Sequence, residues 1–383
     1  MFPPLAYIDW IEGRPGAADH DLGSSDLRPA GPDDSADPIP SRLRGLAPPA
    51  SDATLRERVA DEYGVAPDRV LATAGATHAG FLAAATAAAL ARERSDADRR
   101  PRALVEDPGY EPLVKTPRGL GTRVERFERP GPRAPLDPER IAGAADGLTG
   151  PLAHATVTNR HNPTGRLTDR ETLAATAEVV ADRGGHLVVD EVYAPYTVGR
   201  SDEASGDRRG GTDPRTAFGG PTAAGLPATV AVGSLTKFHG LGGLRVGWLV
   251  GPEPFVDRAR TVERHVPGLA TPSASLARRF FAHRDELVAE ARDYCRRNHD
   301  LLAGFLADRR DLEGVVADDS PFGVLRHESA DGDAVAEAAW DAGVLVVPGR
   351  FFGVPDGVRV SLGRAPDDCA AALDALGRVL DGL

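Results

Sequence analysis

Strands and helices alternate along the first half of this chain, and each strand ends in a cluster of polar or small residues. The hydrophobic pattern predicts strands over residues 69–73, 102–106, 124–127, 154–158 and 186–189, with helices over 54–63, 76–92 and 137–145. The run 186–189 is apolar without alternation, as expected of a strand covered on both faces. A β-α-β-α rhythm gives a mainly parallel sheet with right-handed crossovers. We therefore predict an α/β fold.

The later part of the chain predicts an antiparallel addition to this sheet and a second, smaller unit. Residues 229–232 and 244–249 are strands joined too closely to hold a crossover helix, so we expect them to pair antiparallel. A long helical stretch over 273–309 then leads to strands at 323–327, 344–347 and 358–361 and helices at 333–342 and 367–380. We predict three parts: an N-terminal arm with part of a small domain (1–45), a large domain (46–272), and a small α/β domain with its bridging helix (273–383).

Local signals complete this outline. Thr168 and Glu171 have the reciprocal spacing of a capping box, which predicts a helix from there to about residue 183. Pro252 is expected to open a helix that runs to about residue 265. Residues 199–226 are rich in Gly, Asp and Arg without a period, and we interpret them as a surface excursion.

Composition excludes several classes of function. A formal charge of -12 without a basic block argues against a nucleic-acid or acidic-membrane partner. No apolar stretch approaches the ~20 residues of a membrane helix, and residues 1–10 do not resemble a signal peptide. Cys295 and Cys369 are far apart and the histidines lack ligand spacing, so we expect no metal site. We expect a cytoplasmic protein, and the acidic, arginine-rich composition suggests adaptation to high salt.

The polar clusters should meet in space. In an open parallel sheet, ligands bind outside the carboxyl ends of the strands. Every unusual cluster of this chain follows a predicted strand: Gly75-Ala76-Thr77, Tyr110, Asn162, Asp190 with Tyr193, and Ser234 with Lys237. We therefore expect these residues on one rim of the sheet.

Lys237 is the most specific of these residues. Lys115 and Lys237 are the only lysines in the chain, and all other cationic side chains apart from histidine are arginines. Arginine cannot lose its proton or form an imine with an aldehyde. A lysine kept at the end of an apolar strand, close to Arg245, is therefore a candidate nucleophilic amine. A solvated surface lysine is the alternative.

The other residues of the rim suit an aldehyde cofactor with a pyridine ring and a phosphate. Asp190 would keep the ring nitrogen protonated, because a close opposite charge favours the charged form. Asn162 and Tyr193 offer hydrogen bonds to the phenolic oxygen of the ring, and Tyr110 an aromatic face. For the phosphate, the chain offers Arg245, Ser234 and the turn at Gly75, Ala76 and Thr77 before a helix.

Together these pieces resemble the class I/II aminotransferases that depend on pyridoxal phosphate (PLP), which have the fold called type I. The matching segments are Ala74-Gly75-Ala76-Thr77, Asp107-Pro108-Gly109-Tyr110, His161-Asn162-Pro163-Thr164-Gly165, Asp190-Glu191-Val192-Tyr193, Ser234-Leu235-Thr236-Lys237 with Arg245, and Pro348-Gly349 with Arg359-Val360-Ser361. Taken singly, each has an ordinary structural explanation: a plain turn for Asn162, a helix cap for Asp190, a surface ion pair for Arg359. Because all six segments occur in the order that the family has, six separate structural explanations do not account for them.

The resemblance implies a large domain with a mainly parallel sheet, a smaller C-terminal α/β domain and a role for each site residue. Lys237 would hold PLP as a Schiff base and then carry a proton between the substrate's α-carbon and the cofactor. Arg359, aided by Asn162, would bind the substrate α-carboxylate through a bidentate fork. The resemblance also implies a homodimer whose site lies at the subunit interface.

Two positions depart from the family pattern. Relatives often carry a tyrosine, which reaches the phosphate of the neighbouring subunit, where this chain has Leu46. Many relatives have a glycine close to the substrate carboxylate where this chain has Ser25. These departures concern the contact between subunits and the substrate pocket, not the residues expected around the cofactor.

We conclude that the sequence predicts transfer of an amino group from an L-amino acid to a 2-oxo acid. The same cofactor and fold also serve lyases, decarboxylases and amino-acid-modifying synthases, and Arg359 favours reactions at the α-proton over loss of the carboxylate. A non-catalytic PLP-binding sensor is a further alternative, against which Lys237 and the lack of a basic N-terminal module argue. The side chain of the amino donor is left open.

Overall fold

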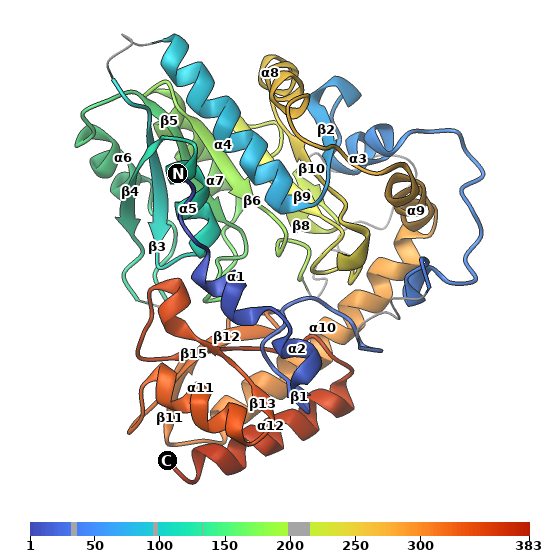
Figure 1. The fold of residues 1–383 in the computed structure, drawn as a ribbon, viewed down its shortest axis with the longest axis vertical. Coiled ribbons are helices and arrows are strands. Elements are labelled where there is room, and N and C mark those ends of the chain that lie inside the picture. The colour runs from blue at the N-terminus through green and yellow to red at the C-terminus, as the bar shows by residue number, and fades with distance from the viewer. Residues whose placement is uncertain (32–36, 95–98, 132, 198–214) are drawn as a thin grey trace.

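The computed structural model describes residues 1–31, 37–94, 99–131, 133–197 and 215–383, which form a larger and a smaller α/β half (Figure 1). Each half has its own sheet and its own hydrophobic cluster. On that basis we propose that the chain divides into domains as the sequence predicts, with boundaries near residues 46 and 273.

A seven-stranded sheet forms the centre of the larger half, in the order β2-β10-β9-β6-β5-β3-β4. Its strands are β2 (Val70–Thr73), β3 (Arg102–Asp107), β4 (Arg123–Glu128), β5 (Leu152–Thr158), β6 (His186–Asp190), β9 (Thr229–Ser234) and β10 (Gly247–Val250). The neighbours from β9 to β4 pair in parallel, whereas β10 is antiparallel to both β9 and β2. The mainly parallel sheet and its antiparallel pair are thus confirmed.

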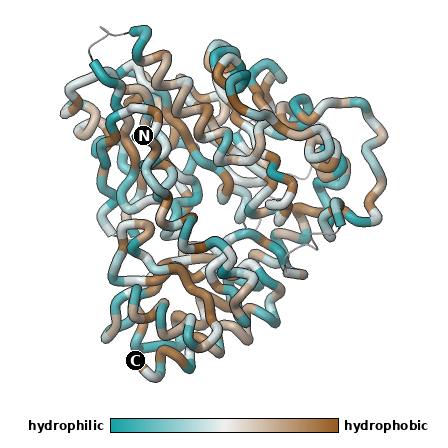
Figure 2. The backbone as a smooth tube through the Cα atoms, viewed as in Figure 1, coloured by the Kyte–Doolittle hydropathy of each residue, from teal (hydrophilic) through white to brown (hydrophobic). Residues whose placement is uncertain are grey.

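Helices cover both faces of this sheet (Figure 1). Helices α4 (Ala76–Glu93), α5 (Glu111–Gly119) and α8 (Glu253–Glu263) lie on one face, and α6 (Pro138–Asp146) and α7 (Arg170–Ala181) on the other. The sequence of β6 does not alternate because helices cover both of its faces. Val188 packs under α4, while Leu187 and Val189 pack under α7. Figure 2 shows the hydrophobic residues concentrated along such interior strands.

Helix α5 was not predicted from the sequence. Two prolines, Pro112 and Pro117, obscure its pattern. Pro112 stands in the first turn, where a missing backbone N–H breaks no intrahelical hydrogen bond. Helix α5 can therefore form even though its prolines make the sequence resemble that of a loop.

The smaller half is built on a four-stranded antiparallel sheet in the order β11-β12-β15-β14. Its elements are β11 (Leu312–Val315), β12 (Phe322–His327), β14 (Val347–Pro348), β15 (Val358–Ser361), α10 (Arg284–Ala307), α11 (Gly332–Asp341) and α12 (Pro366–Leu380). A separate parallel pair joins β1 (His20–Asp21) to β13 (Val344–Leu345), so residues near the N-terminus belong structurally to this half.

The first residues of the chain lie at the junction of the two halves. Helix α1 (Ala6–Ile11) crosses this junction (Figure 1) and buries Tyr7 against Val347 and Phe352. The remaining short elements are α2 (Arg14–Ala17), α3 (Leu55–Tyr63), α9 (Thr271–Ala282), β7 (Thr216–Ala217), β8 (Gly220–Pro221) and 3-10 turns at Ser41–Leu43, Pro67–Arg69, Gly242–Leu244 and Gly349–Phe352.

Two helix predictions were wrong in detail. The stretch 273–309 is not one helix, because His283 leaves the helical conformation (φ -120°, ψ 21°) between α9 and α10. Helix α7 is not capped by Thr168. Its N-cap is Asp169, whose carboxylate accepts a hydrogen bond from Thr172 N–H at 2.7 Å. The backbone of Thr168 instead pairs with the side-chain amide of Asn159.

The surface prediction for 199–226 was wrong for the part that can be described. Residues 198–214 lie outside the described residues. The following hairpin of β7 and β8 is buried at its turn, where Phe218 is 2% exposed. Buried carboxylates satisfy the backbone there, since Glu62 accepts from Phe218 N–H and Glu191 accepts from Ala223 N–H.

Candidate active site

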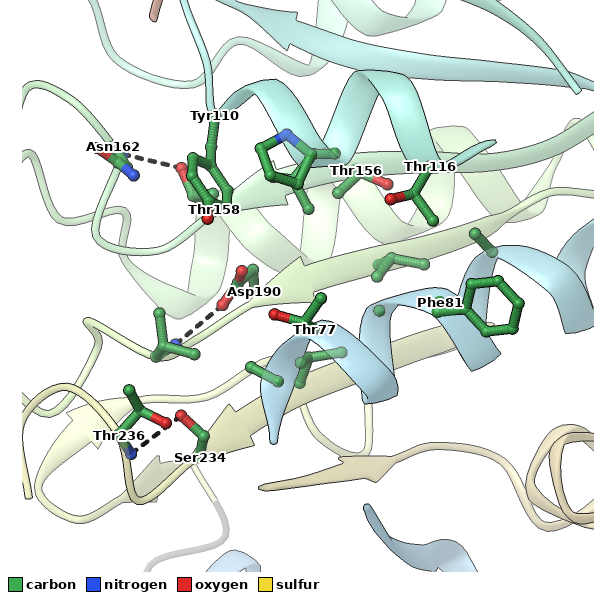
Figure 3. Close-up of a pocket in the computed structure, with 18 of the residues that line it drawn as sticks. Thr77, Phe81, Tyr110, Thr116, Thr156, Thr158, Asn162, Asp190, Ser234 and Thr236 are labelled. Carbon is green, nitrogen blue, oxygen red and sulfur yellow. Dashed lines mark hydrogen bonds between the residues drawn. The ribbon is translucent and has the colours of Figure 1, made fainter. Parts of the chain in front are cut away.

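A cavity of about 440 Å³ opens at the carboxyl ends of the parallel strands. Figure 3 shows side chains from β5, β6, β9, α4 and α5 converging on it. All predicted site residues except Gly75 and Ser25 line it: Ala76, Thr77, Tyr110, Asn162, Asp190, Tyr193, Ser234, Lys237, Arg245 and Arg359. The expected convergence on one rim is therefore what the fold produces.

Gly75 and Ser25 lie just behind the cavity wall. Gly75 has φ +90°, and a Cβ there would come 3.0 Å from the guanidinium of Arg245. Ser25 forms a 2.7 Å hydrogen bond with the hydroxyl of Tyr193. The backbone of this segment reaches the site through Gly23, whose carbonyl accepts from Arg359. Leu46 lies away from the cavity and packs on the core of the larger half.

One end of the cavity can hold an anion. Helix α4 begins here without a side-chain cap, so its first N–H groups and its dipole face the cavity. Arg245 lies beside this helix start and makes no ion pair with any described residue. The hydroxyl of Ser234 is on the same rim and accepts from Thr236 N–H at 3.2 Å. A phosphate fits this combination of groups.

Asp190 supplies a negative charge inside the cavity. Its carboxylate accepts a hydrogen bond from Val192 N–H at 3.2 Å, and no described cation forms an ion pair with it. Burial raises the pKa of Asp190 to about 6, although the Val192 hydrogen bond and the charge of Lys237 oppose that shift. Because no described residue forms an ion pair with Asp190, a protonated ring nitrogen could serve as the ionic partner of its carboxylate.

Lys237 follows the end of β9 and projects into the same cavity. Burial opposes the charge of its ammonium, yet the nearby Tyr193 and Asp26 outweigh burial and raise the pKa of Lys237 above its ordinary value. In the chain alone, the amine is therefore held protonated. Reaction of its nitrogen as a nucleophile requires that this proton first be removed.

Arg359 is a buried cation without an acidic partner among the described residues. It is 1% exposed, and its guanidinium lies 4.7 Å above the ring of Phe352. It donates to Asn162 Oδ1 at 3.2 Å and to the carbonyl of Gly23 at 3.0 Å, while its Nε has no hydrogen-bond partner in the described structure. A cation buried among neutral acceptors is suited to bind a carboxylate.

The buried side chain of Glu106 helps to hold the turn that carries Asn162. Glu106 accepts from both the N–H (2.7 Å) and the hydroxyl (2.6 Å) of Thr158, and it pairs with Arg129 at 2.8 Å. The hydroxyl oxygen of Thr158 in turn accepts from Asn162 N–H at 2.9 Å. Three buried residues therefore hold the turn that carries Asn162.

Tyr7 and Thr158 are site residues that sequence reasoning missed. Tyr7 lines the cavity, packs edge-on against Tyr110 with ring centroids 5.8 Å apart, and accepts from Arg359 at 3.3 Å. Its sequence signal is weak, because nothing in residues 1–11 shows that they cross to the site. Thr158 had a usable signal, since it is the last residue of β5 on the predicted rim.

Comparison with known proteins agrees with this geometry. A family model described as aminotransferase class I and II matches residues 27–376, which is most of the chain. The chain belongs to this family. Its cofactor is therefore PLP, and aminotransferases act on amino acids and 2-oxo acids. The fold is that of PLP-dependent enzymes of type I.

Individual relatives of this aminotransferase carry different names. It is 28% identical to a histidinol-phosphate aminotransferase of Haloferax volcanii over 87% of this chain and 81% of the relative. Among solved structures, it resembles the aspartate aminotransferase of Thermus thermophilus with maleate (TM-score 0.75, 22% identity, 99% and 97% of the two chains). It also resembles a PLP-dependent cyclase called OrfR (TM-score 0.74, 27% identity, 100% and 98%).

Neither a metal-ligating cluster nor a membrane-spanning helix occurs among the described residues. They contain no group of three or more His, Cys, Asp or Glu side chains placed to hold a metal ion. None of their helices is both long and apolar enough to cross a membrane.

Proposed function

We propose that this aminotransferase moves the amino group of an L-amino acid to a 2-oxo acid, with Lys237 as the amine that binds the aldehyde of PLP. The observation that carries the proposal is the position of Lys237 in one cavity with Asp190 and Arg359. The other lysine, Lys115, is outside that cavity and pairs with Glu111 at 2.5 Å. Lys237 is thus the only lysine available to the site.

Each part of the cofactor has a matching group. Arg245, Ser234 and the α4 start formed by Gly75, Ala76 and Thr77 would hold the phosphate. Asp190 would bind the protonated ring nitrogen, Asn162 and Tyr193 would donate to the phenolic oxygen, and Tyr110 would cover the ring. Bound there, PLP supplies an electron-withdrawing ring that makes the α-hydrogen of the substrate acidic.

The chain's own residues then orient the substrate and move its proton. Arg359, held by Asn162 and Tyr7, binds the α-carboxylate and so limits rotation about the Cα bonds. With the cofactor bound, Lys237 Nζ would be the group that carries the proton between Cα and the cofactor. Asp190 would hold the ring nitrogen in its protonated form.

Nitrogen transfer tests this proposal directly. The purified protein with PLP is given ¹⁵N-labelled L-amino acids and unlabelled 2-oxo acids, and the label in the new amino acid is measured by mass spectrometry. We expect transfer for at least one pair, and a loss of about 10²–10⁴-fold for Lys237→Ala. Arg297→Ala, which removes an exposed cation of α10 outside the cavity, is the control and should keep its activity. Equal activity of both variants would refute the role of Lys237.

A second reaction class is supported by the similarity to the cyclase. That relative is 27% identical over the whole of this chain, and its name describes a PLP-dependent cyclase, not an aminotransferase. A lyase, decarboxylase or synthase would consume the amino acid without delivering labelled nitrogen to an oxo acid. The same experiment therefore separates this candidate from transamination.

We also propose that the enzyme is a cytoplasmic homodimer. Support for the dimer comes from the phosphate end of the cavity, where Thr77 and Arg245 are exposed in the single chain. A second copy lying across this end would cover them. Light scattering of the PLP-bound protein should give twice the 40.2 kDa chain mass; a monomer would contradict the dimer.

A further inference from the structure

Part of the cavity that contains Lys237 and Arg359 has apolar walls. We define the apolar compartment by Leu5 and Ile8 of the N-terminal segment, Phe81 of α4, and Leu113 and Pro117 of α5. Figure 3 shows Phe81 and Thr116 on the two helices that flank it. This compartment adjoins the carboxylate-binding end, because Tyr7, between Leu5 and Ile8 in the chain, contacts Arg359.

The cations that line the cavity are already assigned to other groups. Among the described lining residues they are Lys237, Arg245 and Arg359. Two of them face the phosphate end and the carboxylate end, and Lys237 binds the cofactor. His154 also lines the cavity, but burial lowers its pKa to about 4, so it is neutral at pH 7. No described lining cation is left for a second anionic group on the substrate.

Glu111 and Lys115 of α5 hold the N-terminal segment in place. Glu111 accepts from Tyr7 N–H at 2.8 Å and pairs with Lys115, whose ammonium donates to the carbonyl of Pro4 at 2.7 Å. Phe2 extends the contact with its ring centroid 6.4 Å from that of Phe81. These contacts keep the segment against the cavity and leave Glu111 and Lys115 paired with each other, while the remaining charge of α5, Arg118, is exposed and does not line the cavity.

From these observations we propose that the amino donor carries an uncharged, apolar side chain, either aliphatic or aromatic, and that the apolar compartment binds it. This inference rests on the proposed function and names its substrate class. An acidic or phosphorylated side chain would lose its hydration in the compartment without gaining a partner. An apolar side chain has no comparable hydration to lose, and its burial in the compartment is favourable because it removes apolar surface from water.

A panel of donors tests the proposal on the PLP-bound protein. L-leucine and L-phenylalanine are compared with L-aspartate and O-phospho-L-serine by the rate at which each donor changes the visible absorption of the bound cofactor. We expect the second-order rate constant of the better apolar donor to exceed those of both anionic donors at least tenfold. An anionic donor that reacts as fast or faster overturns this inference alone. If none of the four donors reacts, this inference fails, and the nitrogen-transfer experiment decides the proposed function separately.

A substitution in the wall gives an independent measurement. Leu113→Arg introduces a cation into the apolar compartment, and it should raise the ratio of aspartate to leucine rate constants at least tenfold. Leu120→Arg is the matched control, because Leu120 follows the same helix but does not line the cavity. A folded Leu113→Arg protein with an unchanged ratio overturns the inference. If that variant does not fold, the comparison of donors on the wild-type protein decides.

Discussion

Asn162 Oδ1 accepts a hydrogen bond from Arg359 Nη1 at 3.2 Å, although the two residues are 197 positions apart in the chain. Asn162 belongs to the larger half and Arg359 to the smaller half. Their contact therefore joins the group assigned to the phenolic oxygen of the cofactor to the group assigned to the substrate carboxylate. The geometry of both depends on how the turn of Asn162 is held.

Thr158→Val should misplace Asn162 without opening a cavity, because valine has nearly the shape of threonine. It removes the hydroxyl that donates to Glu106 and accepts from Asn162 N–H. The buried Asn162 N–H is then left without a partner, whereas Glu106 keeps Thr158 N–H and Arg129. We expect kcat/KM to fall about 10-fold or more, as buried polar groups without partners cost about 1–3 kcal/mol. Thr176→Val, which removes a buried hydroxyl from α7, is the control. Equal kcat/KM for both variants would contradict the role of Thr158.

Arg129→Met should destabilise the fold strongly. Arg129 is 2% exposed and pairs with Glu106, which is fully buried. Removing one partner leaves an uncompensated buried charge, which costs about 3–5 kcal/mol. Urea unfolding measures this loss, and Arg258→Met, which breaks an exposed pair with Glu93, should cost about 0–1 kcal/mol. A loss below 1 kcal/mol for Arg129→Met would show that Glu106 is neutral or otherwise compensated.

Arg359→Lys should weaken substrate binding while keeping the positive charge. Lysine cannot form the planar bidentate fork, and it would lose contacts with Asn162 and Gly23. We expect KM for the amino donor to rise about 10- to 100-fold, since hydrogen bonds to charged groups contribute about 1.5–3 kcal/mol. Steady-state kinetics with Arg326→Lys as a surface control checks this. An unchanged KM would place the carboxylate elsewhere.

Asp190→Asn should stabilise the cofactor-free protein at neutral pH. The pKa of Asp190 is raised from 3.8 to about 6, so the fold disfavours its ionised form. The cost to stability appears as pH rises from about 4 to 6 and reaches about 3 kcal/mol at most above that range. Thermal unfolding without PLP should therefore show a higher Tm for the variant at pH 7.5 and little difference at pH 4.

The same substitution should have the opposite effect when PLP is bound. Asparagine cannot pair with a protonated ring nitrogen, so the variant should lose both cofactor affinity and activity. Asp293→Asn, an exposed change on α10, serves as the control for both measurements. If Asp190→Asn lowered the Tm of the cofactor-free protein at pH 7.5, burial would not be the cause of the raised pKa.

The sequence alone determined the sheet and the rim of the site. Apolar runs with polar ends are properties of contiguous residues, so the strands, the cluster of Asp190 and Tyr193, and the position of Lys237 could be predicted without a structure. Only the tertiary structure decided what those residues meet. Tyr7 reaches Arg359 across 352 positions, and Glu106 reaches Thr158 across 52. No local pattern records such pairs, because the first arises from the packing of the two halves on each other and the second from the pairing of β3 with β5.

The errors of prediction have the same physical origin. Thr168 had the spacing of a cap, but its backbone was already paired with Asn159, and Asp169 took that role. The hairpin around Phe218 was predicted to lie on the surface because the segment 199–226 as a whole is rich in Gly, Asp and Arg, yet Glu62 and Glu191 satisfy its backbone inside the fold. The sequence specifies which groups are polar, whereas the fold determines which partners satisfy them.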